Sequence, residues 1–205
     1  LALLPNYNEQ GESSLVFMVD DLIQLTQNEF SGFLLSDMES IESRYDSAIH
    51  SEKKVVIFGV SYALLDLAEK GMNLSQATII ETGGMKGKRQ EMSKEAMHEM
   101  LKKGLNVSHI SSEYGMTELL SQAYSKENGL FSLPKWMKII LRETSDPLTE
   151  LSKEKTGGVN VIDLANVYSC SFISTQDLGR LEDGQLRLMG RFDQADIRGC
   201  NLLVE

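Results

Sequence analysis

The chain has 205 residues, of which 41% are hydrophobic and 24% are charged, and its formal net charge at pH 7 is −10. These proportions are those of a globular domain, and the negative charge argues against nucleic acid as the main partner, because phosphate backbones attract clustered Lys and Arg. The two cysteines and three histidines form no zinc-binding pattern. The two cysteines form no C-x-x-C pair, which favours a reducing, cytoplasmic setting. No apolar run suits a membrane span, and no signal-peptide pattern is present.

The first part of the chain alternates helical and strand-like patterns. Apolar residues at the helical period predict a helix over 13–27. Ser36 and Glu39 form a capping-box pattern that predicts a second helix, reaching Ile49. Further on, strands are predicted at 53–60, 77–84 and 107–115, and helices at 62–71, 93–104 and 116–124. Strands that alternate with helices pair in parallel, with the helices on the faces of the sheet.

After residue 130 the pattern changes to strands separated by turn residues. These strands are predicted at 136–143, 157–165, 169–177 and 185–191, with an exposed loop over 145–158. Asp183 and Gly184 form a hairpin signal before the last strand. We therefore predict an α/β fold, in which a Rossmann-like parallel sheet over 1–125 is followed by a smaller antiparallel β subdomain over 126–205.

Two glycine-containing stretches follow predicted strands, at the edge where parallel sheets bind ligands. In ETGGMKG, Gly83 and Gly84 would let the backbone approach a ring or a phosphate, although a plain turn explains them equally well. The spacing does not fit the phosphate loop G-x-x-x-x-G-K, which we reject. In SEYGMTE, Thr117 would cap the next helix and Glu118 would suit its dipole, but the same arrangement would also bind a phosphate with Mg²⁺.

Other polar residues have simple structural interpretations. STQDLGRL places Asp177 at a strand end, where an Asx-type turn explains it. GRFDQADIRG, which contains Arg191 and Asp193, is typical of a salt-bridged surface turn. His98 is expected to face solvent and His109 to lie in a strand.

Taken in order, YGMTE, TQD and GRFDQADIRG resemble three motifs of the adenylate-forming superfamily, which are Y-G-x-T-E, T-G-D and G-R-x-D-D-x-I-K. ETGGMKG, SEYGMTELLSQAYS, NVIDLAN and SCSFI further resemble the acyl-protein synthetases, or long-chain-fatty-acid–protein ligases, of bacterial bioluminescence systems and their relatives in non-luminous bacteria. The likeness extends over essentially the whole chain. The order of the three motifs is more specific than any one of them.

The resemblance implies a nucleotide site built from the first motifs. Gly83 and Gly84 would line the adenine and acyl pocket. Tyr114, followed by Gly115, would pack on the adenine. Thr117 would reach the α-phosphate and Glu118 would bind Mg²⁺.

The later motifs imply ribose contacts, a hinge and an acyl carrier. Asp177 and Arg191 would hold the ribose, and Asp193 would act as a hinge. Cys200 matches the cysteine that carries the acyl group as a thioester in the acyl-protein synthetases. Gln176, however, stands where T-G-D has its glycine, which weakens the expected ribose contact.

The implied reaction is ATP-dependent activation of a fatty acid to acyl-AMP, followed by transfer of the acyl group to a protein cysteine. Its cofactors would be ATP and Mg²⁺, and its partners a carboxylic acid and an acyl reductase or another acyl-accepting protein. Two alternatives stay open, a coenzyme A ligase of the phenylacetate type and a non-catalytic module that binds an acyl group or a partner. The family's triphosphate loop lies upstream of Y-G-x-T-E and has no match here. We therefore expect a carboxyl-terminal portion, with a segment before Leu1, that by itself binds nucleotide weakly or not at all.

Overall fold

The structure is a computed structural model that describes residues 1–4, 13–83, 92–152 and 154–192. The chain divides into two compact units. The first is Leu1–Thr117 with Lys126–Asn128, and the second is Glu118–Ser125 with the described residues from Gly129 on. Within the described residues, no helix combines the length and the apolar character that crossing a membrane requires.

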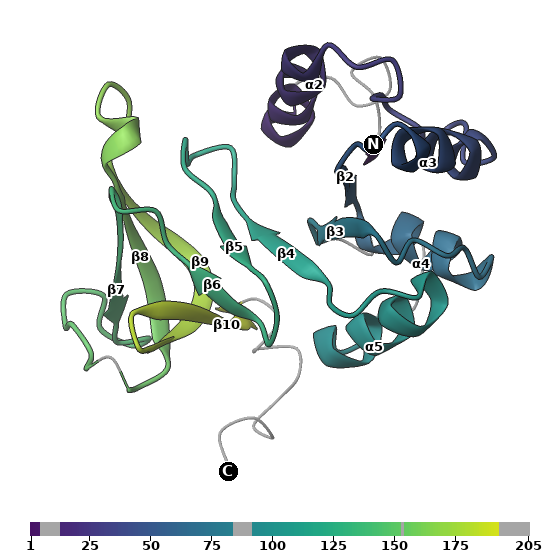
Figure 1. The fold of residues 1–205 in the computed structure, drawn as a ribbon. Coiled ribbons are helices and arrows are strands. Elements are labelled where there is room, and N and C mark those ends of the chain that lie inside the picture. Colours follow the sequence, from purple (N-terminus) through teal and green to yellow (C-terminus); the bar gives the residue numbers. More distant parts are fainter. Residues whose placement is uncertain (5–12, 84–91, 153, 193–205) are drawn as a thin grey trace. The chain divides into compact units, whose positions relative to one another are not determined.

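The first unit is a parallel sheet with helices. Its strands lie in the order β1 (Ala2–Leu3), β2 (Val55–Gly59), β3 (Ala77–Glu81) and β4 (Ser111–Tyr114), and each pairs in parallel with the next. Its helices are α2 (Ser14–Thr26), α3 (Ser40–His50), α4 (Ser61–Glu69) and α5 (Lys94–Leu105) (Figure 1). The predicted alternation of strands and helices up to β4 is confirmed.

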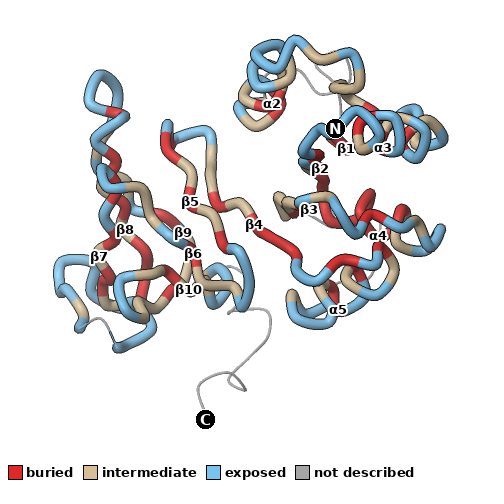
Figure 2. Tube along the Cα trace, in the orientation of Figure 1, coloured by how far each residue is buried: buried red, intermediate tan, exposed pale blue. Residues whose placement is uncertain are grey.

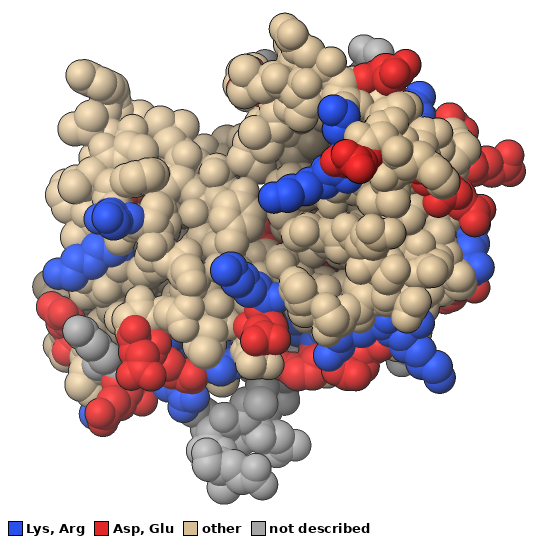
Figure 3. Space-filling view, viewed as in Figure 1, with Lys and Arg blue, Asp and Glu red and all other residues tan. Residues whose placement is uncertain are grey.

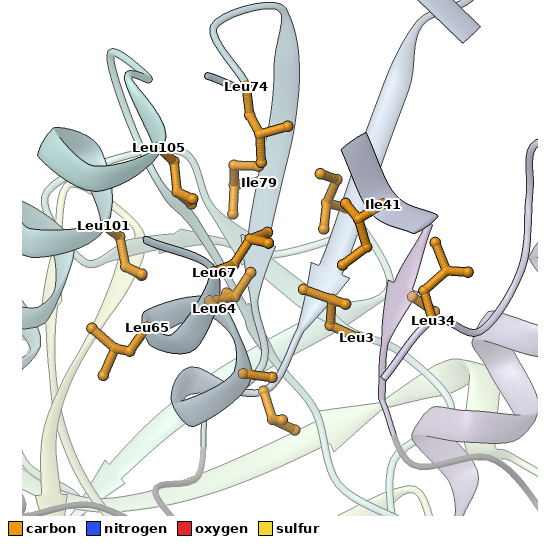
Figure 4. Close-up of a cluster of buried hydrophobic side chains, with 14 of the residues drawn as sticks. Leu3, Leu34, Ile41, Leu64, Leu65, Leu67, Leu74, Ile79, Leu101 and Leu105 are labelled. Atoms are coloured by element: carbon orange, nitrogen blue, oxygen red, sulfur yellow. The ribbon is translucent and has the colours of Figure 1, made fainter. Parts of the chain in front are cut away.

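Apolar side chains from strands and helices form the core of this unit (Figure 4). Ile57 of β2 and Ile79 of β3 are buried, as are Leu64 and Leu67 of α4 and Leu101 of α5. Burying one such side chain contributes about 1.5–3 kcal/mol to stability. Figure 2 shows that most of α4 and of β4 is buried. This core fixes the carboxyl ends of β3 and β4, where the predicted site residues follow.

Two helix ends differ from their predictions. α3 begins only at Ser40, and Glu39 makes no side-chain capping bond, so the predicted capping box from Ser36 is wrong. Gly104 lies within α5, which ends at Leu105 and is capped by Asn106 with a left-handed φ of 54°. A Cβ on Gly104 would come within 2.5 Å of the carbonyl oxygen of Ala68 on α4. Gly104 therefore permits close packing of two helices and does not stop α5.

The second unit is an antiparallel sheet. Its strands lie in the order β5 (Ala123–Ser125), β6 (Leu130–Ser132), β10 (Gln185–Arg191), β9 (Phe172–Glu182), β8 (Gly157–Asp163) and β7 (Met137–Arg142). Asp183 and Gly184 have φ angles of 49° and 82°, which confirms the predicted hairpin between β9 and β10. Asn128 and Gly129, with φ angles of 59° and 65°, form a similar turn between β5 and β6, two strands that were not predicted.

The surface carries both signs of charge. On the face shown in Figure 3, Lys and Arg side chains stand among Asp and Glu side chains. The chain as a whole is acidic, with a formal net charge of −10.

Candidate functional site

The segment after β4 does not form the helix predicted over 116–124. Thr117 and Glu118 lie in a turn, and β5 follows. The backbone amides of Leu120 and Ser121 donate to the carboxylate of Asp163, at 3.0 and 2.9 Å, and are therefore not used in a helix. The prediction of a helix N-terminus at Thr117 is therefore wrong.

Asp163 organises this segment from the end of β8. It is fully buried, and its carboxylate also accepts a hydrogen bond from the hydroxyl of Ser121 at 2.7 Å. Trp136 donates to the same hydroxyl at 2.8 Å. Asn166, in the short 3-10 helix Leu164–Asn166, donates to the carbonyl oxygen of Glu118 at 2.7 Å. These bonds fix the backbone of Glu118 and leave the residue exposed.

Asp177 and Arg191 lie opposite each other on the antiparallel strands β9 and β10. The Oδ1 atom of Asp177 is 4.0 Å from the Nε atom of Arg191. The side chain of Asp177 is 16% exposed and that of Arg191 is 54% exposed, so a ligand can reach both. The structure thus brings together the two residues to which the resemblance assigns the ribose contacts.

Glu118 is held near the start of β9, away from the pair of Asp177 and Arg191. The side chain of Asn166 that holds Glu118 also donates to the carbonyl oxygen of Cys170, just before β9 begins at Phe172. Phe172 pairs with Ile162 and Leu178 pairs with Gly158, four residues apart on β8, so Asp177 lies roughly 13 Å along the sheet from the start of β9 at the usual rise per residue. A ligand that meets both Glu118 and Asp177 therefore has to extend along β9.

The TQD segment, Thr175 to Asp177, is a β-bulge. Asn160 pairs with Ser174 and Gly158 pairs with Leu178, so the three bulge residues stand opposite Val159 alone. Bulges re-aim side chains and are frequent beside functional sites.

Gln176, the middle residue of this bulge, is exposed and does not have a positive φ. The position occupied by glycine in the T-G-D motif therefore does not require glycine in this chain.

The first unit holds the remaining described candidates. Gly83 follows β3 with a φ of 80°, a conformation that favours glycine. Tyr114 ends β4 and is buried, and Gly115 follows it, half-buried. Thr117 is exposed, with its hydroxyl 3.3 Å from that of Ser14 at the start of α2. Gly84, Asp193 and Cys200 lie outside the described residues.

A buried carboxylate beside Gly83 was missed in the sequence. Glu81, the last residue of β3, is 2% exposed and accepts hydrogen bonds from Ser61 at 2.9 Å and Ser112 at 3.1 Å. The Nζ atom of Lys94 lies 3.5 Å from the carboxylate, and the Nε2 atom of His98 lies 3.7 Å from it. His98 is 13% exposed, so the prediction that it faces solvent is wrong. His109 is exposed and outside β4, contrary to its prediction.

The two acids near the end of this sheet have opposite pKa shifts. Burial raises the pKa of Glu81, but His98, Lys94 and Ser61 outweigh burial and lower that pKa to about 2. Burial raises the pKa of Glu113 to about 7, with a further contribution from the charge of Glu81 and opposition from Lys94. Glu113 therefore titrates near neutral pH, beside Tyr114.

The described residues contain no group of three or more His, Cys, Asp or Glu placed to hold a metal ion. Mg²⁺ is usually held by one or two carboxylates together with substrate phosphates. The exposed carboxylate of Glu118 is a donor of this kind. Cys170 is a free, exposed thiol.

Comparisons with known proteins reveal similar structures. No protein-family model matches the chain. No curated protein matches it either. ATP-bound MatB from Rhodopseudomonas palustris is 16% identical, with a TM-score of 0.55 over 76% of this chain and 33% of that one. The O-succinylbenzoate coenzyme A synthetase MenE from Bacillus subtilis, in complex with AMP, is 21% identical, with a TM-score of 0.51 over 75% and 34%. The anthranilate CoA ligase AuaEII, in complex with anthranoyl-AMP, is 14% identical, with a TM-score of 0.51 over 75% and 32%.

These structural neighbours are adenylate-forming enzymes, and the chain spans about a third of their length. The predicted fold class, a parallel sheet with helices followed by an antiparallel β part, is confirmed. At such low sequence identity, the similarity to these structures supports the fold alone. The narrower resemblance to acyl-protein synthetases stays a prediction. The chain has the fold of a portion of an adenylate-forming enzyme.

Proposed function

We propose that the chain is part of an ATP-dependent ligase that converts a carboxylic acid to its acyl adenylate. The observation that carries this proposal is the pair of Asp177 and Arg191, 4.0 Å apart at a bulge in a chain with this fold. A carboxylate accepts hydrogen bonds from ribose hydroxyls, and a guanidinium donates to ribose oxygens. The two side chains are therefore a matched set for the sugar of ATP.

In the proposed reaction, a carboxylate oxygen of the acid attacks the α-phosphorus of ATP. The bond between that phosphorus and the bridging oxygen breaks, and pyrophosphate leaves. We propose that Thr117 donates to the α-phosphate, and that Gly83, Gly84 and Tyr114 with Gly115 surround the adenine and acyl groups. Glu118 would hold Mg²⁺, which neutralises negative charge on the phosphates when it is bound.

We further propose that the acid is a fatty acid and that the acceptor is a protein cysteine, Cys200. The thiolate attacks the acyl carbon, the bond from that carbon to AMP breaks, and AMP leaves as the thioester forms. The motif order and the match of Cys200 to the acyl-carrying cysteine of the acyl-protein synthetases support this acceptor. An acyl reductase or another acyl-accepting protein would then take the acyl group. Asp193 is proposed as a hinge residue.

A coenzyme A ligase is the second candidate. MenE is a coenzyme A synthetase and AuaEII is a CoA ligase. In this case coenzyme A supplies the thiol, and Cys200 takes no part in the chemistry.

The two acceptors can be separated with the complete protein that contains this chain. It is incubated with ATP and labelled fatty acid, alone or with coenzyme A, and the same is done with the Cys200→Ser and Cys170→Ser variants. A hydroxylamine-sensitive protein label that is lost only in Cys200→Ser supports acyl-protein transfer. Acyl-CoA formation that is unchanged in Cys200→Ser supports the coenzyme A ligase. If no acid supports pyrophosphate exchange, adenylation itself is contradicted and a binding module remains.

A further inference from the structure

Arg142, the last residue of β7, is a buried cation bound by neutral oxygens. It is 8% exposed. Its Nη1 donates to the carbonyl oxygen of Val159 at 3.1 Å and to the Oδ1 of Asn160 at 2.7 Å. Its Nη2 donates to the carbonyl oxygen of Thr175 at 2.6 Å. In the part of the chain that the structure describes, it forms no salt bridge with a carboxylate. Burying a guanidinium on these terms is costly, so a specific role is expected for it.

Two of the three acceptors, the carbonyl oxygens of Val159 and Thr175, belong to the bulge that contains Asp177, and the third, Asn160, is the residue next to Val159 on β8. Val159 is the single residue opposite the bulge, and Thr175 is its first residue. The hydroxyl of Thr175 also donates to the carbonyl oxygen of Val159 at 2.8 Å and accepts from the backbone amide of Asp177 at 3.1 Å. Arg142 therefore donates to two backbone carbonyl oxygens at the bulge, those of Val159 and Thr175. Because Thr175 in turn accepts a hydrogen bond from the amide of Asp177, Arg142 is connected to Asp177 through Thr175.

Arg142 also contacts the end of the other strand of the pair. Its Cζ atom lies 5.3 Å from the ring centroid of Phe192, which directly follows Arg191, at a distance typical of a cation–π contact. A Cβ on Gly158 would come within 2.7 Å of the same Cζ atom and 2.9 Å of the Phe192 ring. Glycine at position 158 thus leaves the space in which the guanidinium and the ring lie.

We propose that Arg142 is a positioning residue, which holds the bulge on β9 and Phe192 after β10 so that Asp177 and Arg191 face the ribose of ATP together. A planar guanidinium with five donors can bond several acceptors in fixed directions, whereas the ammonium of Lys cannot reproduce that fork. The ribose part of this proposal rests on the proposed function, whereas the positioning of the bulge does not.

The ribose part is tested by nucleotide affinity in the complete protein. We compare Arg142→Lys with the control Arg180→Lys, which lies on β9 and pairs with Glu182. Arg142→Lys should weaken ATP binding about tenfold, the worth of one charge-assisted hydrogen bond, and leave 2′,3′-dideoxy-ATP binding unchanged. In the Asp177→Asn background it should have no further effect on ATP. An equal loss for both nucleotides, or a loss that persists in Asp177→Asn, would overturn the proposal.

The positioning part is tested without any nucleotide, by hydrogen exchange. In Arg142→Lys and in Gly158→Ala, the amide of Asp177 should exchange at least tenfold faster, while that of Leu181 at the other end of β9 is unchanged. Unchanged exchange at Asp177 in both variants would overturn the positioning role. If the wild-type protein does not distinguish ATP from 2′,3′-dideoxy-ATP, the ribose contact fails, and the exchange result still decides what Arg142 does.

Discussion

The carboxylate of Glu81 at the end of β3 lies 3.1 Å from the hydroxyl of Ser112 on the neighbouring strand β4. Its other oxygen accepts from Ser61 of α4, so one buried charge links two strands and a helix. Gly83 follows β3, and Tyr114 is the last residue of β4. Glu81 therefore supports the backbone from which two proposed nucleotide contacts arise.

Replacing Glu81 by Gln should destabilise the protein by about 2–4 kcal/mol at pH 7, because one buried acceptor oxygen becomes a donor and the negative charge beside Lys94 and His98 is lost. Urea unfolding measures the change. Glu99→Gln is the matched control, since Glu99 is exposed on α5 and pairs with Lys102 within the helix. That control should change stability by less than about 0.5 kcal/mol. Equal effects of the two variants would show that the buried carboxylate is dispensable.

The lowered pKa of Glu81 predicts an acid-sensitive fold. Its folded-state pKa is about 2, below the ordinary value of 4.5, so its contribution is complete above pH 4.5 and is lost as the pH falls toward 2. Stability measured between pH 6 and pH 2 should therefore fall less steeply in Glu81→Gln than in the wild type. Parallel curves would contradict the assigned pKa.

Glu113 predicts the opposite trend near neutral pH. Its folded-state pKa of about 7 exceeds 4.5, so the folded state holds a proton that the unfolded state has released, and stability falls as the pH rises from 4.5 to 7. Glu113→Gln removes this cost and should be more stable than the wild type above pH 7, by about 3 kcal/mol. The difference between the two proteins should vanish near pH 4.5. A difference that does not depend on pH would contradict this account.

Asp163 anchors the backbone before β5. Asp163→Asn replaces one acceptor oxygen by an amide that faces backbone N–H groups, which should cost about 2–3 kcal/mol. Thermal unfolding measures the loss. Asp183→Asn is the control, because Asp183 lies in a turn with a φ of 49°, a conformation that Asn tolerates well. If Asp163→Asn were as stable as that control, the anchoring of Leu120 and Ser121 would be unimportant.

Most elements could be predicted because their patterns are local. Apolar runs bounded by polar residues predicted β2 and β3, and Asp183-Gly184 predicted the last hairpin. The helix over 116–124 was wrong because its competitor, Asp163, is distant in sequence and takes the amides that a helix would use. Residues from Leu119 to Ser125 are alternately buried and more exposed, as in a strand. Two of the buried positions are the small polar residues Ser121 and Ser125, so the sequence does not show the apolar alternation that would have predicted a strand.

The candidate site was predictable only in part. The motif order pointed to Asp177 and Arg191, but their pairing depends on the register of β9 and β10. The role of Arg142 depends on a bulge that pattern alone does not reveal. Glu81 was missed, although its position two residues after Ile79 places both on the same face of β3, where both are buried.

The most direct test of the central claim is acid-dependent exchange of labelled pyrophosphate into ATP, measured with the complete protein and its Asp177→Asn variant. We predict exchange that requires a carboxylic acid and falls at least tenfold in Asp177→Asn, with thermal stability unchanged. Absence of exchange with every acid tried, or exchange that is unaffected by Asp177→Asn, would contradict the assignment of this chain to an adenylate-forming ligase.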